Sequence, residues 1–563
     1  MTACTSVVSG GPRQLLPDVG TVCYRLPNIR IGVQSMKAEI VDAARKAYAS
    51  AGNAITLGAI LHDGECHPEP IVQIPLAMLN RHGLIAGATG TGKTRTLQLV
   101  AEQLSRAGVS VFLSDVKGDL SGVGAAGTPN ERIDRRVKDT GFAWNPTSFP
   151  VELLSLTGKS GAQLRATVSS FGPLLLSKVL GLNDTQTSVL TLVFKYCDDK
   201  GLALLDFSDL RAVLQYLTGD GADELKDYGG MSKQTVGVLL REMVELEQQG
   251  AESFFGEPEF DIGDLMQIER DGRGLVSVLE LADVQDKPAL FSTFMLWMLA
   301  SLYNELPEVG DVDKPKLVFF FDEAHLLFDE ASKALLDEVE KVVRLIRSKG
   351  VGIFFITQSP KDIPASVLGQ LGNRVQHALR AFTADDDKAL KAAARTFPKT
   401  SFYDIEETLT TLGIGDALVT VLSPNGAPTP PFATRLVPPA ARMSPLTPDE
   451  MSQRLASSAQ VREYATPIDR ESARELLAKR IEASAAAEAG SDPGDKPDDR
   501  AVAGVGPARR SGGRAPKPEP STLDKVVNSP LTRTIAGAVT RGIMGALLGS
   551  PRRRSTRKRS SLW

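Results

Sequence analysis

The chain has 563 residues, of which 42% are hydrophobic and 23% charged, enough for two or three domains with an ordinary buried core. Its formal net charge of −4 excludes a protein that coats nucleic acid over its whole surface, so any basic surface must be local. With no secretory signal, no long apolar run and no closely spaced framework among its four cysteines, we expect a cytoplasmic protein without an integral membrane segment.

The first part of the chain predicts an irregular and then helical segment, residues 1–53, in which Met36 opens the helical stretch and is an alternative start of translation. Residues 54–79 predict short strands around an Asp-Gly turn. The apolar run 84–86 then leads into a Gly-rich loop, a stretch of apolar residues at helical spacing and the strand 109–113. This order predicts a β-α-β unit of a parallel sheet.

Residues 150–250 change character and predict a mostly helical insertion, with apolar residues three or four apart from Leu164 to Leu182. The sheet is expected to resume afterwards. Its expected elements are a strand at 275–279, a helix at 289–303, a strand at 317–321, a helix at 335–346, a strand at 351–356 and final strands within 412–435. We therefore expect one α/β domain over residues 54–440, with a mostly parallel central sheet.

Beyond residue 440 the sequence no longer predicts a continuous α/β domain. Residues 441–525 predict helix and then a low-complexity, disordered linker, and 526–563 predict an amphipathic helix with a basic tail. The apolar face of that helix precedes two basic triplets, Arg552–Arg554 and Arg557–Arg559. Residues 531–559 could contact DNA phosphates, an anionic membrane or a neighbouring protein, or could be a solvated tail, and the sequence leaves these alternatives open.

One motif carries the chemistry. Eight consecutive residues match G-x-x-x-x-G-K-[ST], and this phosphate-binding loop consists of Gly87, Ala88, Thr89, Gly90, Thr91, Gly92, Lys93 and Thr94. The glycines let backbone N–H groups point at phosphate oxygens, and the helix that follows adds its positive N-terminal end. Lys93 is expected to reach the β- and γ-phosphates of ATP, and the Thr94 hydroxyl to bind Mg²⁺.

A second motif completes this expectation. The apolar strand at 319–321 ends in Asp322 and Glu323. Asp322 fits the role of holding Mg²⁺, and Glu323 that of polarising the attacking water. An acidic pair at this place also suits the N-cap of a following helix, and the two roles are compatible. The two motifs together predict a P-loop ATPase that uses ATP and Mg²⁺.

Two further sets of polar residues follow strands of the expected sheet. Gln358 closes the strand 351–356, where its amide could contact the γ-phosphate. Asp115 and Lys117 follow the strand beside the phosphate-binding loop. Because the carboxyl ends of parallel strands form the ligand crevice, these two residues either line the site or form a turn.

Residues 322–325 read Asp-Glu-Ala-His, which also matches the signature of DEAH helicases. Those helicases hold ATP between two tandem RecA-like domains of one chain, and the roughly 120 residues that follow the sheet here are too few for a second domain. Another copy of this chain would then complete the nucleotide cleft. This predicts a ring, in which an arginine of a neighbour stabilises the transition-state charge.

Over roughly residues 54–440 the chain resembles the HerA/FtsK superfamily of P-loop motors, specifically bacterial HerA-like helicase-domain proteins. The resemblance rests on six segments, 73–76, 87–94, 115–119, 322–325, 357–358 and 372–374. It implies a RecA-like fold and homo-hexameric rings that pump or unwind double-stranded DNA. By the family's motif pattern Arg347 is the candidate catalytic arginine, and Arg374 is the second candidate.

The chain departs from the family in one respect. HerA proper carries a sizeable β-barrel before its ATPase domain, whereas about 80 residues precede the loop here and only residues 54–79 are strand-like. This departure puts HerA's nuclease partner and its DNA-end-processing role in question. The leading interpretation is an ATP-driven DNA translocase or helicase. The alternative is a P-loop switch or scaffold that acts on protein or membrane partners without moving DNA.

Overall fold

The computed structural model describes residues 29–49, 52–328 and 333–490, which all belong to one compact unit, Met1–Ser491. The terminal helix and basic tail expected at 526–563, and most of the expected low-complexity linker, lie outside these residues. Among the described residues no helix is long and apolar enough to cross a membrane.

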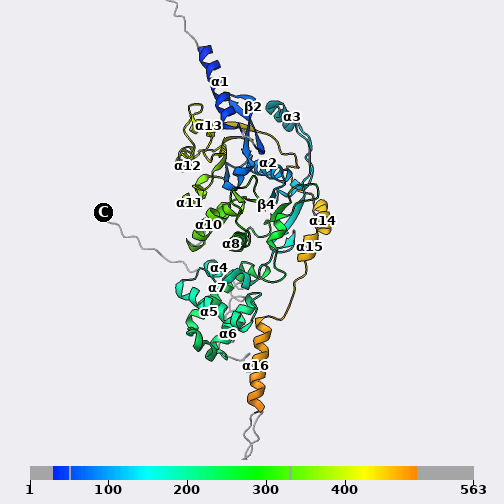
Figure 1. The fold of residues 1–563 in the computed structure, drawn as a ribbon, viewed down its shortest axis with the longest axis vertical. Coiled ribbons are helices and arrows are strands. Elements are labelled where there is room, and N and C mark those ends of the chain that lie inside the picture. The colour runs from blue at the N-terminus through cyan, green and yellow to red at the C-terminus, as the bar shows by residue number, and fades with distance from the viewer. Residues whose placement is uncertain (1–28, 50–51, 329–332, 491–563) are drawn as a thin grey trace, which may run out of the picture. The chain divides into compact units, whose positions relative to one another are not determined.

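A single sheet organises the described part of the chain (Figure 1). Its order is β2-β1-β12-β11-β10-β3-β9-β8-β4-β7-β5-β6. Every neighbouring pair from β10 to β6 is parallel, and the pairs from β2 to β10 are antiparallel. The strands are β1 (Ala54–His62), β2 (Glu65–Pro75), β3 (Gly83–Ala86), β4 (Ser110–Asp115), β5 (Val151–Ser155), β6 (Ala162–Gln163), β7 (Val276–Glu280), β8 (Leu317–Phe321), β9 (Val351–Thr357), β10 (Asn373–His377), β11 (Asp416–Thr420) and β12 (Phe432–Leu436). The prediction of a mostly parallel central sheet is confirmed.

Helices cover both faces of the sheet, which explains the uninterrupted apolar runs of its strands. In β8, Phe319 and Phe321 belong to one core and Val318 and Phe320 to the other. The helices are α1 (Ile29–Ala47), α2 (Lys93–Arg106), α3 (Glu131–Thr140), α4 (Val168–Val179), α5 (Asp184–Lys200), α6 (Phe207–Thr218), α7 (Lys233–Gln248), α8 (Pro288–Glu305), α9 (His325–Phe328), α10 (Lys333–Leu345), α11 (Ala365–Leu368), α12 (Ala384–Ala394), α13 (Ile405–Thr411), α14 (Pro448–Ser457), α15 (Ala459–Tyr464) and α16 (Ala473–Gly490). The core of α8 and α10 lies on one face, and the core of α2 and α1 on the other.

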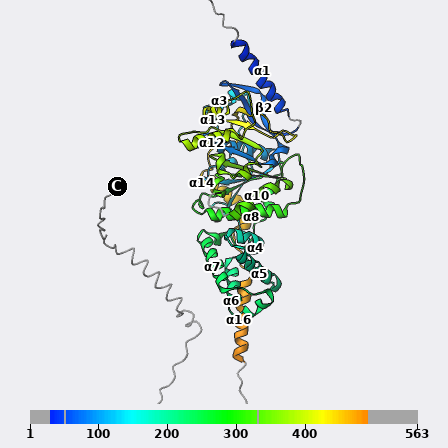
Figure 2. The same ribbon diagram turned by 90° about the vertical axis from the view of Figure 1, so that its left-hand side faces the viewer.

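The predicted insertion is helical, but its first residues belong to the sheet. β5 and β6 extend the parallel sheet beyond β7, and helix α4 begins at Val168, where Thr167 caps it, instead of at Leu164. The prediction was wrong there because Ala166 exchanges backbone hydrogen bonds with Phe254 and Gly256 and so continues the extended chain. Helices α4 to α7 gather into a helical lobe, shown in Figure 2, that contacts α8 and α10 through α4.

The ends of the described unit also refine the expectations. Within the described residues helix α1 spans Ile29–Ala47, so it includes residues before the predicted Met36. The expected hairpin is present, and Asp63 and Gly64 turn it with φ values of 49° and 76°. This hairpin joins the sheet because β1 pairs with β12.

A C-terminal segment follows the last strand and reaches the helical lobe. Tyr464, at the end of α15, donates its hydroxyl to Asp264 at 2.8 Å and accepts a hydrogen bond from Arg165 through its carbonyl at 2.9 Å. Helix α16 then packs against α6 of the lobe. The helical part of the 441–525 prediction therefore extends to residue 490, where the described residues end.

Candidate nucleotide site

The phosphate-binding loop connects the end of β3 to the start of α2. Its three glycines, Gly87, Gly90 and Gly92, have φ values of 154°, 76° and 119°, a region that residues with a side chain rarely adopt. A Cβ atom on Gly87 would lie 2.5 Å from the Cβ of His377, so the close packing beneath the loop also requires glycine. The sequence predicted this loop from its motif, and the structure gives it the strand–loop–helix setting that the motif requires.

Lys93 is the first residue of α2, and its side chain folds back over the loop. The ammonium donates to the carbonyl oxygens of Gly87 at 2.8 Å and Ala88 at 3.3 Å, and only 8% of the residue is exposed. Burial lowers the pKa of Lys93 despite the nearby carboxylates of Glu323 and Asp322. A phosphate anion in the loop would give the buried Lys93 ammonium a negatively charged hydrogen-bond partner.

The acidic pair follows β8, and β9 separates this strand from β3 in the sheet. The Asp322 amide donates to the Ser114 hydroxyl at 3.1 Å, while its Oδ1 accepts from the Glu323 amide at 3.0 Å. Oδ2 is buried and has no hydrogen-bond partner among the described residues. Burial, followed by the charge of Glu323, raises the pKa of Asp322 to about 7.

These features of Asp322 fit a Mg²⁺ ligand. A buried carboxylate oxygen without a hydrogen-bond partner is the kind of atom that a hard divalent cation takes as a ligand. The described residues contain no group of three or more His, Cys, Asp or Glu side chains that could hold a metal by themselves. Mg²⁺ needs no such group, because it is usually held by one or two protein ligands, substrate phosphates and water. Thr94 and Asp322 would be those protein ligands.

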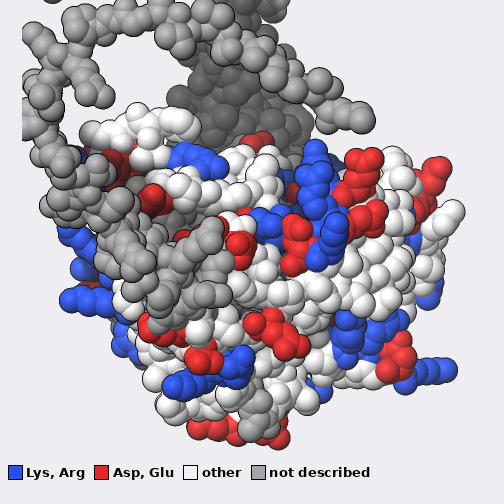
Figure 3. All heavy atoms as spheres, turned by 90° about the horizontal axis from the view of Figure 1, so that it is seen from above, with Lys and Arg blue, Asp and Glu red and all other residues white. Residues whose placement is uncertain are grey.

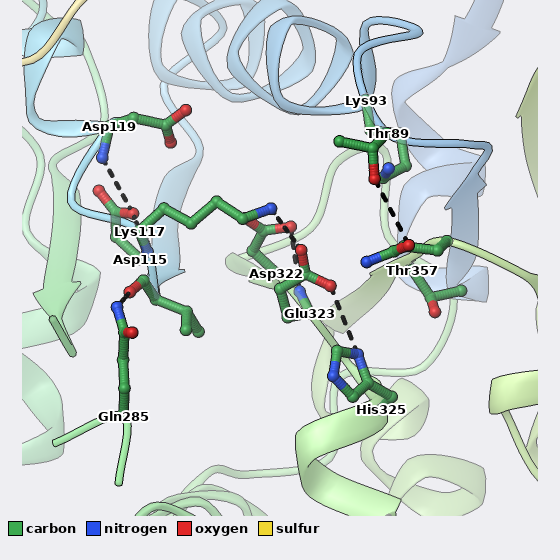
Figure 4. Close-up of polar contacts among 12 residues, drawn as sticks. Thr89, Lys93, Asp115, Lys117, Asp119, Gln285, Asp322, Glu323, His325 and Thr357 are labelled. Carbon is green, nitrogen blue, oxygen red and sulfur yellow. Dashed lines mark hydrogen bonds and ion pairs between the residues drawn. The ribbon is translucent and has the colours of Figure 1, made fainter.

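Glu323 adopts a left-handed backbone conformation with φ of 48°, which is uncommon outside glycine. This bend turns its carboxylate toward Lys117, with which it forms an ion pair, and toward His325 Nδ1 at 3.4 Å (Figure 4). Burial by itself would raise the pKa of Glu323, but the hydrogen bond and charge of Lys117 outweigh burial and lower it. The carboxylate is therefore held ionised, as a water-polarising group requires.

Gln358 follows β9, the strand between the loop and the acidic pair. Its amide oxygen accepts a long hydrogen bond, 3.4 Å, from the Thr89 hydroxyl of the loop, and the Gly87 amide donates to the Thr357 carbonyl at 3.2 Å. A cavity of about 720 Å³ opens here, lined by Ala88, Thr89, His325 and Gln358 among others. The structure therefore places Gln358 beside the part of the loop where the terminal phosphate is expected.

Asp115 and Lys117 have different positions. The fully buried Asp115 carboxylate accepts hydrogen bonds from the backbone amides of residues 117, 118, 119 and 120, so it shapes the turn after β4. Lys117 reaches across from this turn to Glu323. Of the two roles left open by the sequence, Asp115 takes the turn and Lys117 lines the site.

The two candidate arginines lie away from this chain's own loop. Arg347 precedes β9, and Arg374 lies near the start of β10, so both are at the edge of the sheet opposite to the loop. Arg347 is half-exposed and contacts Asp311 at 3.3 Å. The guanidinium of Arg374 donates to three backbone carbonyls of the same chain, those of Leu368, Leu371 and Thr396. Their catalytic roles remain predictions.

Sequence reasoning missed His377, which lies beneath the loop at the end of β10. Its fully buried ring bridges the Thr96 hydroxyl at 2.8 Å and the Asp416 carbonyl at 3.0 Å. Burial lowers its pKa to about 4, so the ring is neutral at pH 7. No local pattern could have found it, because its partners are 281 and 39 residues away.

Comparison with known proteins shows the family of the chain. The family model for the helicase HerA-like C-terminal region matches residues 62–556, most of the chain. The chain belongs to the HerA-like helicase family. A relative in this family is the DNA double-strand break repair helicase HerA of Saccharolobus solfataricus, 21% identical over 70% of this chain and 72% of the relative. The HerA of Sulfolobus acidocaldarius is also 21% identical, over 62% of this chain and 64% of the relative.

Solved structures are also similar to this chain. The bacterial conjugative coupling protein TrwB is 15% identical with a TM-score of 0.45, and the match covers 71% of this chain and 93% of that one. VirB4 of Thermoanaerobacter pseudethanolicus is 16% identical with a TM-score of 0.40, covering 71% and 99%. The mostly parallel sheet with helices on both faces and the match to the family model confirm the RecA-like fold expected from the sequence.

Proposed function

We propose that this HerA-like protein is an ATP-hydrolysing motor that works on DNA as a homo-hexameric ring. The observation that carries the proposal is the convergence of Lys93, Gln358 and Glu323 at one edge of the sheet. They follow the strands β3, β9 and β8, which are neighbours in the sheet and far apart in sequence. The unpaired oxygen of Asp322 next to them supports a magnesium nucleotide as the ligand.

In the proposed mechanism the loop amides bind the phosphates, and Lys93 leaves the loop carbonyls for the β- and γ-phosphates. Thr94 and Asp322 would hold Mg²⁺, which neutralises charge that develops on the phosphates. Glu323 orients the attacking water for in-line displacement, and Gln358 lies where it can sense loss of the γ-phosphate.

The ring is proposed because neither candidate arginine of a chain lies near that chain's own phosphate-binding loop. Arg347 and Arg374 are at the opposite edge of the sheet from their own loop, so either arginine could reach a nucleotide only in a neighbouring copy. A neighbour's arginine is a recurring way to stabilise charge in phosphoryl transfer. The structure supports Arg347 over Arg374 for this role, because the Arg374 guanidinium is already bonded to three carbonyls.

The charge distribution limits where DNA would lie. Residues 164–265, which contain the helical lobe, carry 17 acidic and 8 basic residues, so this lobe would repel a phosphate backbone. Figure 3 shows basic and acidic side chains interspersed on the face seen from above, without a field of one sign. DNA contact would therefore involve a few local basic residues and would depend steeply on salt.

Turnover of ATP with and without duplex DNA tests the proposal. We expect duplex DNA to stimulate the wild type at low salt, and sizing to show a larger assembly with ATP. Lys93→Ala should lose nucleotide binding, whereas Glu323→Gln should bind ATP but turn over at least about a hundredfold more slowly. Lys195→Ala, an exposed lysine of the helical lobe, is the matched control.

Two results would contradict parts of this proposal. Full activity in both site variants would reject the ATPase assignment. Active ATPase without stimulation by DNA at low salt would instead favour a switch or scaffold that acts on protein or membrane partners.

A further inference from the structure

The phosphate-binding loop is held from outside by two backbone contacts. At its start, the Gly87 amide donates to the carbonyl of Thr357, the last residue of β9, at 3.2 Å. Near its end, the Thr91 carbonyl accepts the Gly415 amide at 2.8 Å. The first contact comes from a strand of the sheet, whereas the second comes from the turn at 413–415 that precedes β11. The second contact therefore depends on what fixes this turn.

The contact between the turn and the loop sets the direction of a loop amide. The Thr91 carbonyl and the Gly92 N–H belong to one trans peptide unit, and a planar trans peptide points these two groups in opposite directions. Because the carbonyl points at Gly415, the Gly92 N–H points away from the turn, as an amide that faces phosphate oxygens inside the loop must. Glycine at position 92 permits this conformation, with φ of 119°.

The side chain of Arg136, from helix α3, holds the turn. Its guanidinium donates to the carbonyls of Ile414 at 2.7 Å and Gly415 at 2.9 Å, and at a longer distance, 3.5 Å, to that of Leu436. It also pairs with the Asp416 carboxylate at 2.9 Å. The Gly415 carbonyl additionally accepts the Leu436 amide at 3.2 Å. A rigid guanidinium binds several acceptors at fixed angles, so Arg136 fixes the orientation of the turn as well as its position.

The turn fits closely against Arg136 and is also connected to α2. Gly415 has φ of 76°, and a Cβ atom on it would lie 3.0 Å from Arg136 Nη2. The carbonyl of the next residue, Asp416, contacts the buried His377 ring at 3.0 Å, and that ring contacts the hydroxyl of Thr96 in the first turn of α2 at 2.8 Å. The turn that Arg136 holds is therefore linked both to the loop and to the helix that follows the loop.

Arg435 of β12 provides a comparison within the same chain. Both arginine side chains are 24% exposed, and both pair with the buried Asp416 carboxylate, Arg435 at 3.2 Å. The Arg435 guanidinium donates to two carboxylates, those of Asp416 and Asp139, whereas Arg136 donates to carbonyls of the turn. The two residues thus share an ion-pair network and differ in their contact with the turn.

We propose that Arg136 is a positioning residue of the nucleotide site, which through the turn at 413–415 sets the direction of the Gly92 N–H before a phosphate binds. This role rests on the function proposed above, because the ligand of the loop is taken to be a nucleotide. Without Arg136, part of the binding energy would be used to orient the loop, so the affinity for the nucleotide would fall. The amide faces the phosphates in the bound substrate and in the transition state alike, so kcat would change little.

The test measures affinity and turnover separately on the full chain. Calorimetry would give the affinity for Mg-ATP in the Glu323→Gln background, which limits hydrolysis during the titration, and steady-state kinetics would give kcat and KM with Glu323 intact. We expect Arg136→Met to weaken the affinity and raise KM at least about fivefold, with kcat within about twofold of the wild type. Arg435→Met, the matched control, should keep the affinity and KM of its parent chain.

Unchanged affinity in Arg136→Met, or an equal loss in Arg435→Met, would overturn the positioning role and leave the ATPase intact, because a loss of stability alone reduces the fraction of active chains and not their affinity. Arg136→Lys and Arg435→Lys keep a charge beside Asp416 and form a second matched pair if a methionine variant does not fold. Again only the Arg136 variant should weaken binding, by at least about threefold, since an ammonium lacks the guanidinium's fork of donors. A parent chain that does not bind Mg-ATP would instead reject the proposed function and this role with it.

Discussion

Lys117 and Glu323 form an ion pair between the turn after β4 and the turn after β8 (Figure 4). The two strands are neighbours in the sheet, although 206 residues separate the two side chains in sequence. Glu323 is 5% exposed and lies next to the buried Asp322, so Lys117 provides the positive charge that lets two adjacent carboxylates share a buried site.

Replacing Lys117 should therefore impair turnover more than binding. In Lys117→Met the Glu323 carboxylate loses its partner and its orientation, and we expect kcat to fall at least about tenfold while ATP affinity changes less than about threefold. Steady-state kinetics and calorimetry would measure the two effects. Lys117→Arg, which keeps the charge, should recover part of the rate, and an unchanged kcat in Lys117→Met would exclude a positioning role.

Substitutions of the two candidate arginines should differ in their effect on the free energy of unfolding. Arg374→Ala removes three hydrogen bonds to backbone carbonyls, and we expect the free energy of unfolding to fall by about 2–3 kcal/mol. Arg347→Ala removes a half-exposed side chain and should leave unfolding nearly unchanged. Chemical denaturation would check both.

If Arg347 acts on a neighbour's nucleotide, mixing Arg347→Ala chains with Glu323→Gln chains should restore turnover, because some interfaces then contain both residues. Each variant by itself should stay slow. A wild-type rate in Arg347→Ala alone would remove this residue from the mechanism.

The buried carboxylate of Glu102 in α2 should make the stability of the fold depend on pH. This carboxylate accepts the amides of Ala440, at 2.7 and 2.9 Å, and Ala441, at 3.0 Å. Burial raises its pKa from 4.5 to about 7, against the effect of these amides. Between these pH values the folded chain binds a proton that the unfolded chain lacks, so this group's contribution to stability is lost as pH rises from about 4.5 through 7.

Glu102→Gln should remove this dependence. Relative to the wild type, the variant should gain about 2 kcal/mol in free energy of unfolding at pH 8 compared with pH 5, measured by urea denaturation at both pH values. Glu463→Gln, at an exposed glutamate, is the control and should show no such difference. Parallel pH profiles for the wild type and Glu102→Gln would show that Glu102 is ionised in the fold throughout this range.

The loop at 87–94 and the pair at 322–323 could be predicted because each motif is local. Glycines at fixed spacing and an apolar strand that ends in carboxylates carry their own geometry. The same reasoning gave the parallel strands, since buried strands are apolar throughout. It failed at Leu164, where apolar spacing of three or four residues also fits an extended chain that pairs with a distant segment.

The sequence by itself thus determined that a phosphate-binding loop and an acidic strand end exist in this chain, because short-range backbone preferences and residue chemistry suffice for that. Only the tertiary structure decided what surrounds them. The order β3-β9-β8-β4 brings Gln358, Asp322, Glu323 and Lys117 to one edge, and packing against β10 and β11 places His377 and Gly415 under the loop. Strand order depends on the burial of the whole sheet between two helical layers, a long-range requirement that no local pattern encodes.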